Sequence, residues 1–326
     1  MRRWGGLLIA AAAALGTAAL VVRSRARRAE REYPPTGGFV EVDSILLHYV
    51  EQGRGQPVVL LHGNGATVED WRISGVLDRA AAAHRVVAFD RPGFGHSERP
   101  RRTAWTPTAQ AALLHRAMRR LGIERPIVVG HSWGTQVALA LALDHPEEVG
   151  ALVLVSGYYF PTARADVPLL SPPAIPVLGD VMTHTVSPLL GRLLAPKIVR
   201  RIFAPAPVPE RFAARLPIEL SLRPAQLRAS AADTAFMVPA AAALSRRYRA
   251  LDLPVVIVTG SADRIVDAAR HSFRIHRLLP GSEMLVVAGA GHMVHHSAPG
   301  QVIEAIERAA RQADQSWRPS GGHGNS

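Results

Sequence analysis

The sequence contains no cysteine and only one lysine, Lys197, among its 326 residues. The absence of cysteine excludes disulfides, thiolate metal sites and cysteine nucleophiles, although it does not indicate a cellular compartment. A net charge of +12 would by itself favour nucleic acid or an anionic membrane surface as a partner. The basic residues are scattered arginines without interleaved aromatic residues, so we expect no nucleic-acid binding.

An apolar run near the N-terminus has arginines on both sides. Trp4–Val22 contains no charged residue and is close to the minimum length for a membrane-spanning helix, so it predicts an uncleaved transmembrane anchor. No small-residue cleavage site follows it, which disfavours the alternative of a cleaved signal peptide. The five arginines between Arg23 and Arg31 outnumber the two that precede the run and favour a cytoplasmic body. We expect a membrane protein in which residues 1–37 form the anchor and a polar stalk, the stalk over residues 24–37.

Short apolar runs alternate with helical stretches after the stalk. Residues 39–52 predict a hairpin that turns at Asp43-Ser44. Continuous apolar runs predict strands buried on both faces, at Pro57–Leu61, Arg85–Phe89, Ile127–Gly130, Ala151–Val155, Val255–Thr259 and Met284–Val287. Helices are predicted at Thr108–Leu121, Thr135–Asp144, Ala268–Leu279 and Gln301–Arg311. This alternation indicates an α/β fold with a mostly parallel sheet.

One long interval interrupts the alternation. Residues 157–249 contain no convincing strand and many prolines, which predicts a helical cap inserted into a core of residues 38–156 and 250–313. Within the cap, Pro188–Phe203 mixes leucines with basic residues. We favour a lid helix with its apolar face over the pocket, and the alternative is a basic helix at a membrane surface. Residues 314–326 predict a disordered tail.

The pentapeptide GHSWG occupies residues 130–134, after a predicted strand and before a predicted helix. It matches G-x-S-x-G, in which two glycines permit a sharp turn and the serine stands exposed above the sheet. Ser132 is therefore the candidate nucleophile, although an ordinary glycine-bounded turn is the simpler interpretation of the pentapeptide alone.

A serine nucleophile needs a base and a carboxylate that orients the base. His292 lies in a glycine-containing loop after the last predicted strand, and Asp263 directly follows the preceding strand. Asp267 is expected to cap the next helix instead. His295 and His296 are rival bases, and HMVHH also suggests a metal site. We discount the metal because no carboxylate or thiolate completes the set in the sequence.

Acyl transfer also needs N–H donors for an oxyanion. The backbone N–H groups of Trp133, after the nucleophile, and Asn64, in the loop HGNG, are the candidates. We expect His62 to hold this loop without a catalytic role.

These motifs together resemble the α/β-hydrolase superfamily, in the branch with an HG-x-P loop, D-x-x-G-x-G-x-S and G-x-S-x-G. In this sequence the three motifs are HGNG, DRPGFGHS at residues 90–97, and GHSWG. The resemblance covers residues 39–311. Gly65 replaces the usual proline, which predicts a looser oxyanion loop. Asn64 and Trp133 match halide-binding positions of haloalkane dehalogenases. Those enzymes and epoxide hydrolases use aspartate at the elbow, so Ser132 excludes both activities.

The resemblance implies a serine hydrolase with no cofactor, and we expect it to act on small apolar esters. Other triad chemistry stays open: amide, lactone or carbon–carbon bond hydrolysis, transacylation and perhydrolysis. A membrane-tethered ligand binder without catalysis is a further alternative. The oligomeric state is not predicted.

Overall fold

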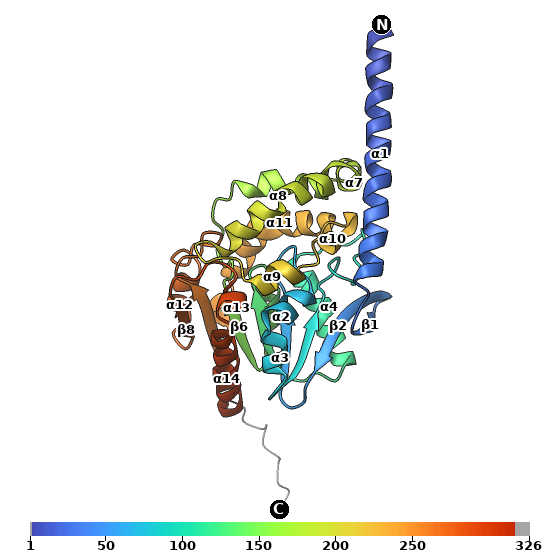
Figure 1. Ribbon diagram of the computed structural model, residues 1–326. Helices are drawn as coiled ribbons and strands as arrows, with labels where there is room; N and C mark the ends of the chain where they lie inside the picture. Colours follow the sequence, from blue (N-terminus) through green and yellow to red (C-terminus); the bar gives the residue numbers. More distant parts are fainter. Residues whose placement is uncertain (1, 317–326) are drawn as a thin grey trace, which may run out of the picture.

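The fold is built on one eight-stranded sheet, seen in the computed structural model, which describes residues 2–316 (Figure 1). The order across the sheet is β1-β2-β4-β3-β5-β6-β7-β8. The pairs β1–β2 and β2–β4 are antiparallel and the other pairs are parallel, which agrees with the predicted fold class. The strands are β1 (Gly38–Val42), β2 (Ile45–Gln52), β3 (Pro57–Leu61), β4 (Arg85–Phe89), β5 (Ile127–His131), β6 (Ala151–Val155), β7 (Val255–Gly260) and β8 (Glu283–Val287).

The first two strands form the predicted hairpin. Asp43 and Ser44 both have positive φ, at 50° and 60°. Two consecutive positive φ values are the mark of the two-residue turn whose twist matches antiparallel strands. The register therefore pairs Val42 with Ile45 directly across the turn.

The central strands are buried on both faces because helices cover both sides of the sheet. The prediction of full burial is wrong for β8. This strand lies at the edge of the sheet, and Val286 is 43% exposed. An apolar run does not reveal whether its strand has a neighbour on both sides.

The helices fall into three groups. In the core they are α2 (Val68–Ser74), α3 (Val76–Ala80), α4 (Pro107–Arg120), α5 (Gly134–Asp144), η1 (Pro146–Glu148), α12 (Ser272–Leu278), α13 (Val294–Ser297) and α14 (Pro299–Ser316). Between β6 and β7 they are α6 (Asp166–Leu170), η2 (Pro172–Ala174), α7 (Leu178–His184), α8 (Val186–Phe203), α9 (Glu210–Arg215), α10 (Ile218–Ser221), α11 (Pro224–Ser245) and η3 (Tyr248–Ala250). The chain begins with α1 (Arg2–Glu32).

Two predicted helix boundaries differ from the structure by more than two residues. Helix α12 begins at Ser272, because residues 268–271 form a turn in which Asp267 accepts the N–H of Arg270 at 2.9 Å. Helix α14 continues to Ser316, so the first residues of the predicted tail are helical. The rest of that tail lies outside the described residues.

The cap lies over one end of the sheet, with α11 beneath and α7 and α8 outermost (Figure 1). Helix α8 does not turn an apolar face inward as predicted. Only Pro188 and Phe203 of this helix are buried, while Leu190 and Leu193 are 50% and 75% exposed. Helix α11 supplies the inner layer of the cap, and these two leucines of α8 face away from it.

Helix α1 is continuous from Arg2 to Glu32, so the residues predicted as a stalk extend the helix as far as Glu32. Val22 and Ala29 are buried where α1 packs beside the cap. Within residues 2–316, no helix combines the length and the apolar character needed to cross a bilayer. The transmembrane anchor is thus not supported. The apolar run Trp4–Val22 contains seven alanines and three glycines, which contribute little to insertion into a membrane.

A buried ion pair joins the cap to the core. Asp233 of α11 accepts from the guanidinium of Arg91 at 2.7 Å, and neither side chain is exposed. Its second oxygen accepts from Arg99 at 3.0 Å and from Gln110 at 3.2 Å. Arg91 and Arg99 lie between β4 and α4, and Gln110 lies on α4, so one carboxylate holds α11 against this part of the core.

We predict that Asp233→Ala destabilises the fold by about 3–5 kcal/mol, because it leaves the Arg91 guanidinium buried without its anion. Urea unfolding followed by circular dichroism measures the change. The matched control is Asp252→Ala, which removes an exposed aspartate and should change stability by less than about 0.5 kcal/mol. Equal effects of the two substitutions would contradict this account.

Candidate active site

Ser132 lies on a strained turn between β5 and α5, with φ of +50°. The flanking glycines leave no room for side chains. A Cβ on Gly130 would lie 2.7 Å from the carbonyl oxygen of Gly134, and one on Gly134 would lie 2.4 Å from that of Leu61. The glycines of GHSWG are therefore required by the turn, which holds the serine above the end of the sheet.

The structure brings Ser132, His292 and Asp263 together. His292 Nε2 lies 2.9 Å from Ser132 Oγ, and His292 Nδ1 lies 2.8 Å from Asp263 Oδ2. The other oxygen of Asp263 accepts the N–H groups of Ile265 and Val266 at 2.8 and 2.9 Å. These bonds aim the carboxylate at the imidazole, and the imidazole at the hydroxyl, as a nucleophilic triad requires.

The backbone N–H groups of Trp133 and Asn64 are the predicted oxyanion donors. The structure assigns neither group an acceptor among the described residues. Close by, a Cβ on Gly63 would lie 3.3 Å from Ser132 Cβ, so the loop passes directly beside Ser132. His62 holds the loop as predicted, since its Nε2 accepts the N–H of Arg91 at 3.0 Å.

The oxyanion loop is tied to the cap, in contrast to the looser loop predicted from Gly65. The Asn64 side-chain amide donates to Ser230 O at 3.1 Å and to Thr234 Oγ1 at 2.9 Å. Gln226 donates to Gly65 O at 3.3 Å. Gly65 itself has φ of +79°, which proline cannot adopt. Glycine in place of the usual proline therefore fits a turn that has a positive φ at position 65.

The two side chains that match halide-binding positions are already occupied. The indole N–H of Trp133 donates to Asp233 O at 2.9 Å, and the Asn64 amide points to α11. Their hydrogens are thus used within the protein, which agrees with the exclusion of dehalogenation made from Ser132.

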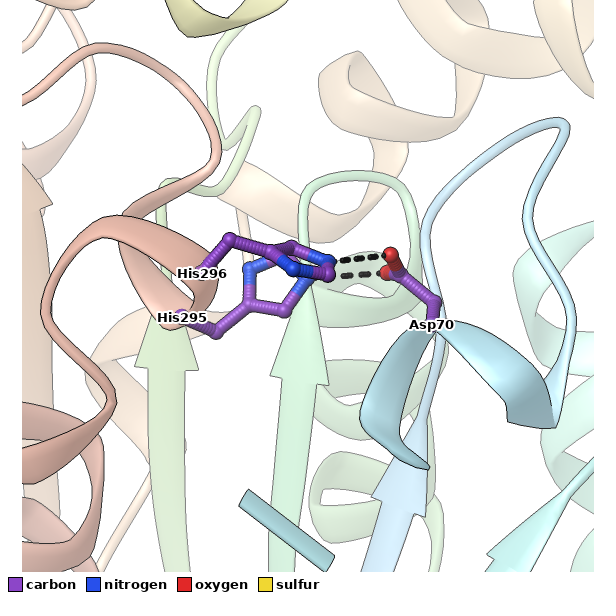
Figure 2. A group of neighbouring side chains, drawn as sticks. All are labelled: Asp70, His295 and His296. Atoms are coloured by element: carbon purple, nitrogen blue, oxygen red, sulfur yellow. Dashed lines mark hydrogen bonds and ion pairs between the residues drawn. The ribbon is translucent and has the colours of Figure 1, made fainter. Parts of the chain in front are cut away.

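Asp70 anchors the segment that follows His292. Figure 2 shows the imidazoles of His295 and His296, on α13, pointing at the Asp70 carboxylate on α2. The Nε2 atoms lie 2.9 and 2.7 Å from its two oxygens, and all three residues are nearly or fully buried. Burial alone would raise the pKa of Asp70, but the two imidazoles hold that pKa well below its usual range. An ionised Asp70 only accepts, so both rings donate to it.

This cluster overturns the argument against a metal at HMVHH. A carboxylate does complete the set, because the fold brings Asp70 to histidines 225 and 226 positions away in the chain. One donor atom from each residue lies within 4.8 Å of the others, so the three side chains could hold a metal ion. Nothing near GHMVHH in the sequence identifies this carboxylate as its partner.

His131, the second residue of GHSWG, contacts His292 of the triad. Its Nε2 lies 3.3 Å from the carbonyl oxygen of His292, and the two rings are 5.1 Å apart. Burial lowers the pKa of His131 well below that of a free histidine. A neutral His131 adds no positive charge beside His292. Sequence analysis assigned this residue no role.

Comparisons with known proteins agree with this geometry. The family described as the alpha/beta hydrolase fold matches residues 56–299. The chain is an α/β hydrolase. It is 30% identical to an uncharacterized protein of Mycobacterium tuberculosis over 84% of this chain and 81% of that one. It is 27% identical to a 2-hydroxymuconate semialdehyde hydrolase of Pseudomonas putida, over 88% of this chain and 98% of the relative.

Among solved structures, this hydrolase is similar to a bacterial membrane phospholipase A, with a TM-score of 0.65 and 22% identity. The alignment covers 97% of this chain and 100% of the other. At this identity the likeness shows the shared fold.

We predict that Asp70→Ala lowers kcat of the hydrolase about tenfold or more with little change in KM, because the His292 loop loses its anchor. Asp70→Asn keeps one acceptor oxygen, so its kcat should lie between those of the unaltered protein and Asp70→Ala. The control is Glu69→Ala on the same helix, whose carboxylate reaches only Arg72 at the surface. A folded Asp70→Ala protein with unchanged kcat would contradict the role given to Asp70.

We also predict that acid destabilises the hydrolase. Burial, together with a nearby arginine, lowers the pKa of His62 and His271 to about 4, whereas an unfolded histidine titrates near 6.5. Between these values the unfolded chain binds protons that the folded chain does not. Stability therefore falls by about 1.4 kcal/mol per pH unit for each histidine as the pH drops from about 6.5 towards 4.

The measurement is urea unfolding at several pH values between neutrality and about 5, where both histidines contribute. His271 accepts the N–H of Tyr159 at 3.0 Å and lies outside the oxyanion loop. His271→Gln should reduce the slope of stability against pH by about 1.4 kcal/mol per unit. An unaltered slope would mean that His271 is protonated in the folded protein.

Proposed function

We propose that the protein is a serine hydrolase that cleaves carboxylic esters with apolar groups through an acyl-enzyme on Ser132. The observation that carries the proposal is the chain of hydrogen bonds from Ser132 through His292 to Asp263, with distances of 2.9 and 2.8 Å. Each member lies at the end of a different strand, and all three meet beneath the cap.

In the proposed reaction, His292 Nε2 accepts the hydroxyl proton as Ser132 Oγ attacks the ester carbonyl carbon. The N–H groups of Trp133 and Asn64 donate to the oxygen that becomes negative. His292 then gives its proton to the departing alcohol, and water hydrolyses the acyl-enzyme by the same route. Asp263 holds the Nδ1–H throughout and stabilises the positive imidazolium.

Apolar side chains border the triad, which favours a substrate with apolar groups. Met293, next to His292, packs with Phe203 and Phe212 of the cap. Val266, in the Asp263 loop, packs with Tyr158 and Ala241.

The charges near the triad favour a neutral ester over a substrate that carries a carboxylate. Arg91 approaches Gly63 of the oxyanion loop but is bound by Asp233 at 2.7 Å. Arg164 donates to Ile265 O in the Asp263 loop but is bound by Asp166 at 2.5 Å. Each guanidinium has its anion within the protein, so neither is free to hold a substrate carboxylate.

Carbon–carbon bond hydrolysis is the second candidate. It is favoured by the similarity, over 98% of the relative's length, to a 2-hydroxymuconate semialdehyde hydrolase. The same nucleophile and base would serve both reactions, so the substrate and not the triad distinguishes them.

We further propose that α1 attaches the enzyme to a membrane, with the body on the cytoplasmic side. The first half of α1 extends beyond the rest of the protein (Figure 1). Along α1, Trp4, Leu7 and Leu20 are 73%, 63% and 70% exposed. The alignment with the membrane phospholipase A includes almost the whole chain, 97% of it. The full-length protein should sediment with membranes after cell lysis, and recovery in the supernatant would contradict this attachment.

We predict that the full-length protein hydrolyses p-nitrophenyl esters and that Ser132→Ala lowers kcat by at least about 10³-fold. A series from acetate to palmitate measures the preferred acyl length. Ser156→Ala is the matched control. Ser156 directly follows the neighbouring strand β6 with φ of +48°, and its hydroxyl has no partner among the described residues. This variant should keep its activity.

The same assay with 2-hydroxymuconate semialdehyde as substrate separates the two candidates. Faster turnover of this compound than of any ester would support carbon–carbon hydrolysis. A folded protein that turns over neither class would contradict both.

A further inference from the structure

Exposed apolar side chains are concentrated in one part of the cap. Of the 21 large apolar residues that are exposed in the described chain, 12 lie between positions 169 and 198. They are Leu169, Leu170, Ile175, Val177, Leu178, Val181, Val186, Leu189, Leu190, Leu193, Leu194 and Ile198. We call this surface, on α6, α7, α8 and the link between α6 and α7, the outer cap face. Exposed apolar side chains that gather in one part of a protein in this way indicate a binding site.

The outer cap face lies beside the helix that carries most of the remaining exposed apolar residues. Five more of the 21 are on α1, including Trp4, Leu7 and Leu20. Helix α1 packs against α7 and α8, with Val22 buried near Pro188 and Leu189. Its free end projects on the side where α7 and α8 are outermost (Figure 1). The two apolar surfaces therefore face the same direction.

Positive charge borders the outer cap face. Helix α8 contains four basic and no acidic residues, and Arg192, Lys197, Arg200 and Arg201 are all exposed. Arg192 pairs with Glu219, while the other three have no ion pair among the described residues. The nearest carboxylates of the face itself, Asp166 and Asp180, are already bound by arginines. An anionic partner would thus meet unneutralised charge.

We propose that the outer cap face docks on the surface of a lipid bilayer that contains anionic lipids. The apolar side chains would enter the boundary between headgroups and acyl chains, and the basic residues would contact the phosphates. The proposal rests on the membrane attachment proposed for α1, and it adds a second contact that orients the body. A helix end alone would leave the body free to rotate above the bilayer.

The docked orientation would place the active site close to the lipid. The carbonyl oxygen of Ile202, in the last turn of α8, accepts the backbone N–H of His292 at 3.1 Å. Phe203, at the end of the same helix, is buried and packs with Met293. Helix α8 therefore runs from the proposed lipid contact to the catalytic histidine, and an apolar ester would reach the triad from the bilayer.

The absence of cysteine allows a direct test in the full-length protein. Leu193→Cys carries an environment-sensitive fluorophore at the most exposed leucine of α8, 75% exposed. Val286→Cys on β8, 43% exposed, is the matched control outside the cap. With phosphatidylcholine vesicles that contain phosphatidylglycerol, the label at position 193 should shift to the blue and brighten several-fold, and lipids with nitroxide-labelled chains should quench it. The label at position 286 should not respond.

Three results would overturn the proposal. The first is binding to vesicles with an unchanged label at position 193, which would leave α1 as the sole contact. The second is the absence of any binding to vesicles. The third is a response of the label without lipid as the protein concentration rises, which would identify the outer cap face as a contact between copies of this chain.

Charge reversal tests the anionic part of the proposal. Lys197→Glu with Arg200→Glu should weaken binding to phosphatidylglycerol vesicles at least about tenfold and spare binding to pure phosphatidylcholine. Arg246→Glu with Arg249→Glu changes the net charge equally at two exposed arginines outside the outer cap face. If both pairs weaken binding alike, only net charge matters and the proposed surface is wrong. These experiments measure binding to vesicles and not hydrolysis, so their results are independent of the ester assay.

Discussion

The positive φ of Ser132 constrains every other part of the candidate site. The turn that produces it brings the backbone of Gly134 against β3 and allows no side chain at either flanking glycine. Such strain persists only where the surroundings hold it, and here the N–H of Ser132 donates to Val155 O in the adjacent strand at 2.9 Å. Strands of the parallel sheet thus crowd this turn and also hold it in its strained conformation. The loops of β3, β7 and β8 converge on the point where Ser132 stands.

The cap has two faces of opposite chemistry. Towards the core, α11 presents polar groups: Asp233 holds Arg91, and the backbone and Thr234 hold the Asn64 amide. The oxyanion loop is therefore attached to the cap as well as to the sheet. Away from the core, α7 and α8 present leucines and arginines that the protein does not cover. A cap with a polar inner face and an apolar outer face agrees with the apolar substrate and the membrane docking that we propose.

Much of the core could be predicted from the sequence because its signals are local. Continuous apolar runs identified the central strands, with bounds at Pro57–Leu61, Arg85–Phe89 and Ala151–Val155 that match the structure. The predictions failed where burial depends on distant neighbours. The run of β8 and the leucines of α8 look like core residues in a linear reading, yet one lies at the sheet edge and the others face outward.

The sequence by itself determined the candidate nucleophile, its candidate base and its candidate carboxylate, since each lies in a motif whose residues are constrained by the turn or loop that carries it. Only the tertiary structure decided what supports them. Asp70 meets His295 and His296 across more than 220 positions, and Asp233 meets Arg91 across 142. No local pattern marks such pairs, because a buried charge is stabilised by whichever partner the fold brings to it, and that partner is set by the packing of whole elements.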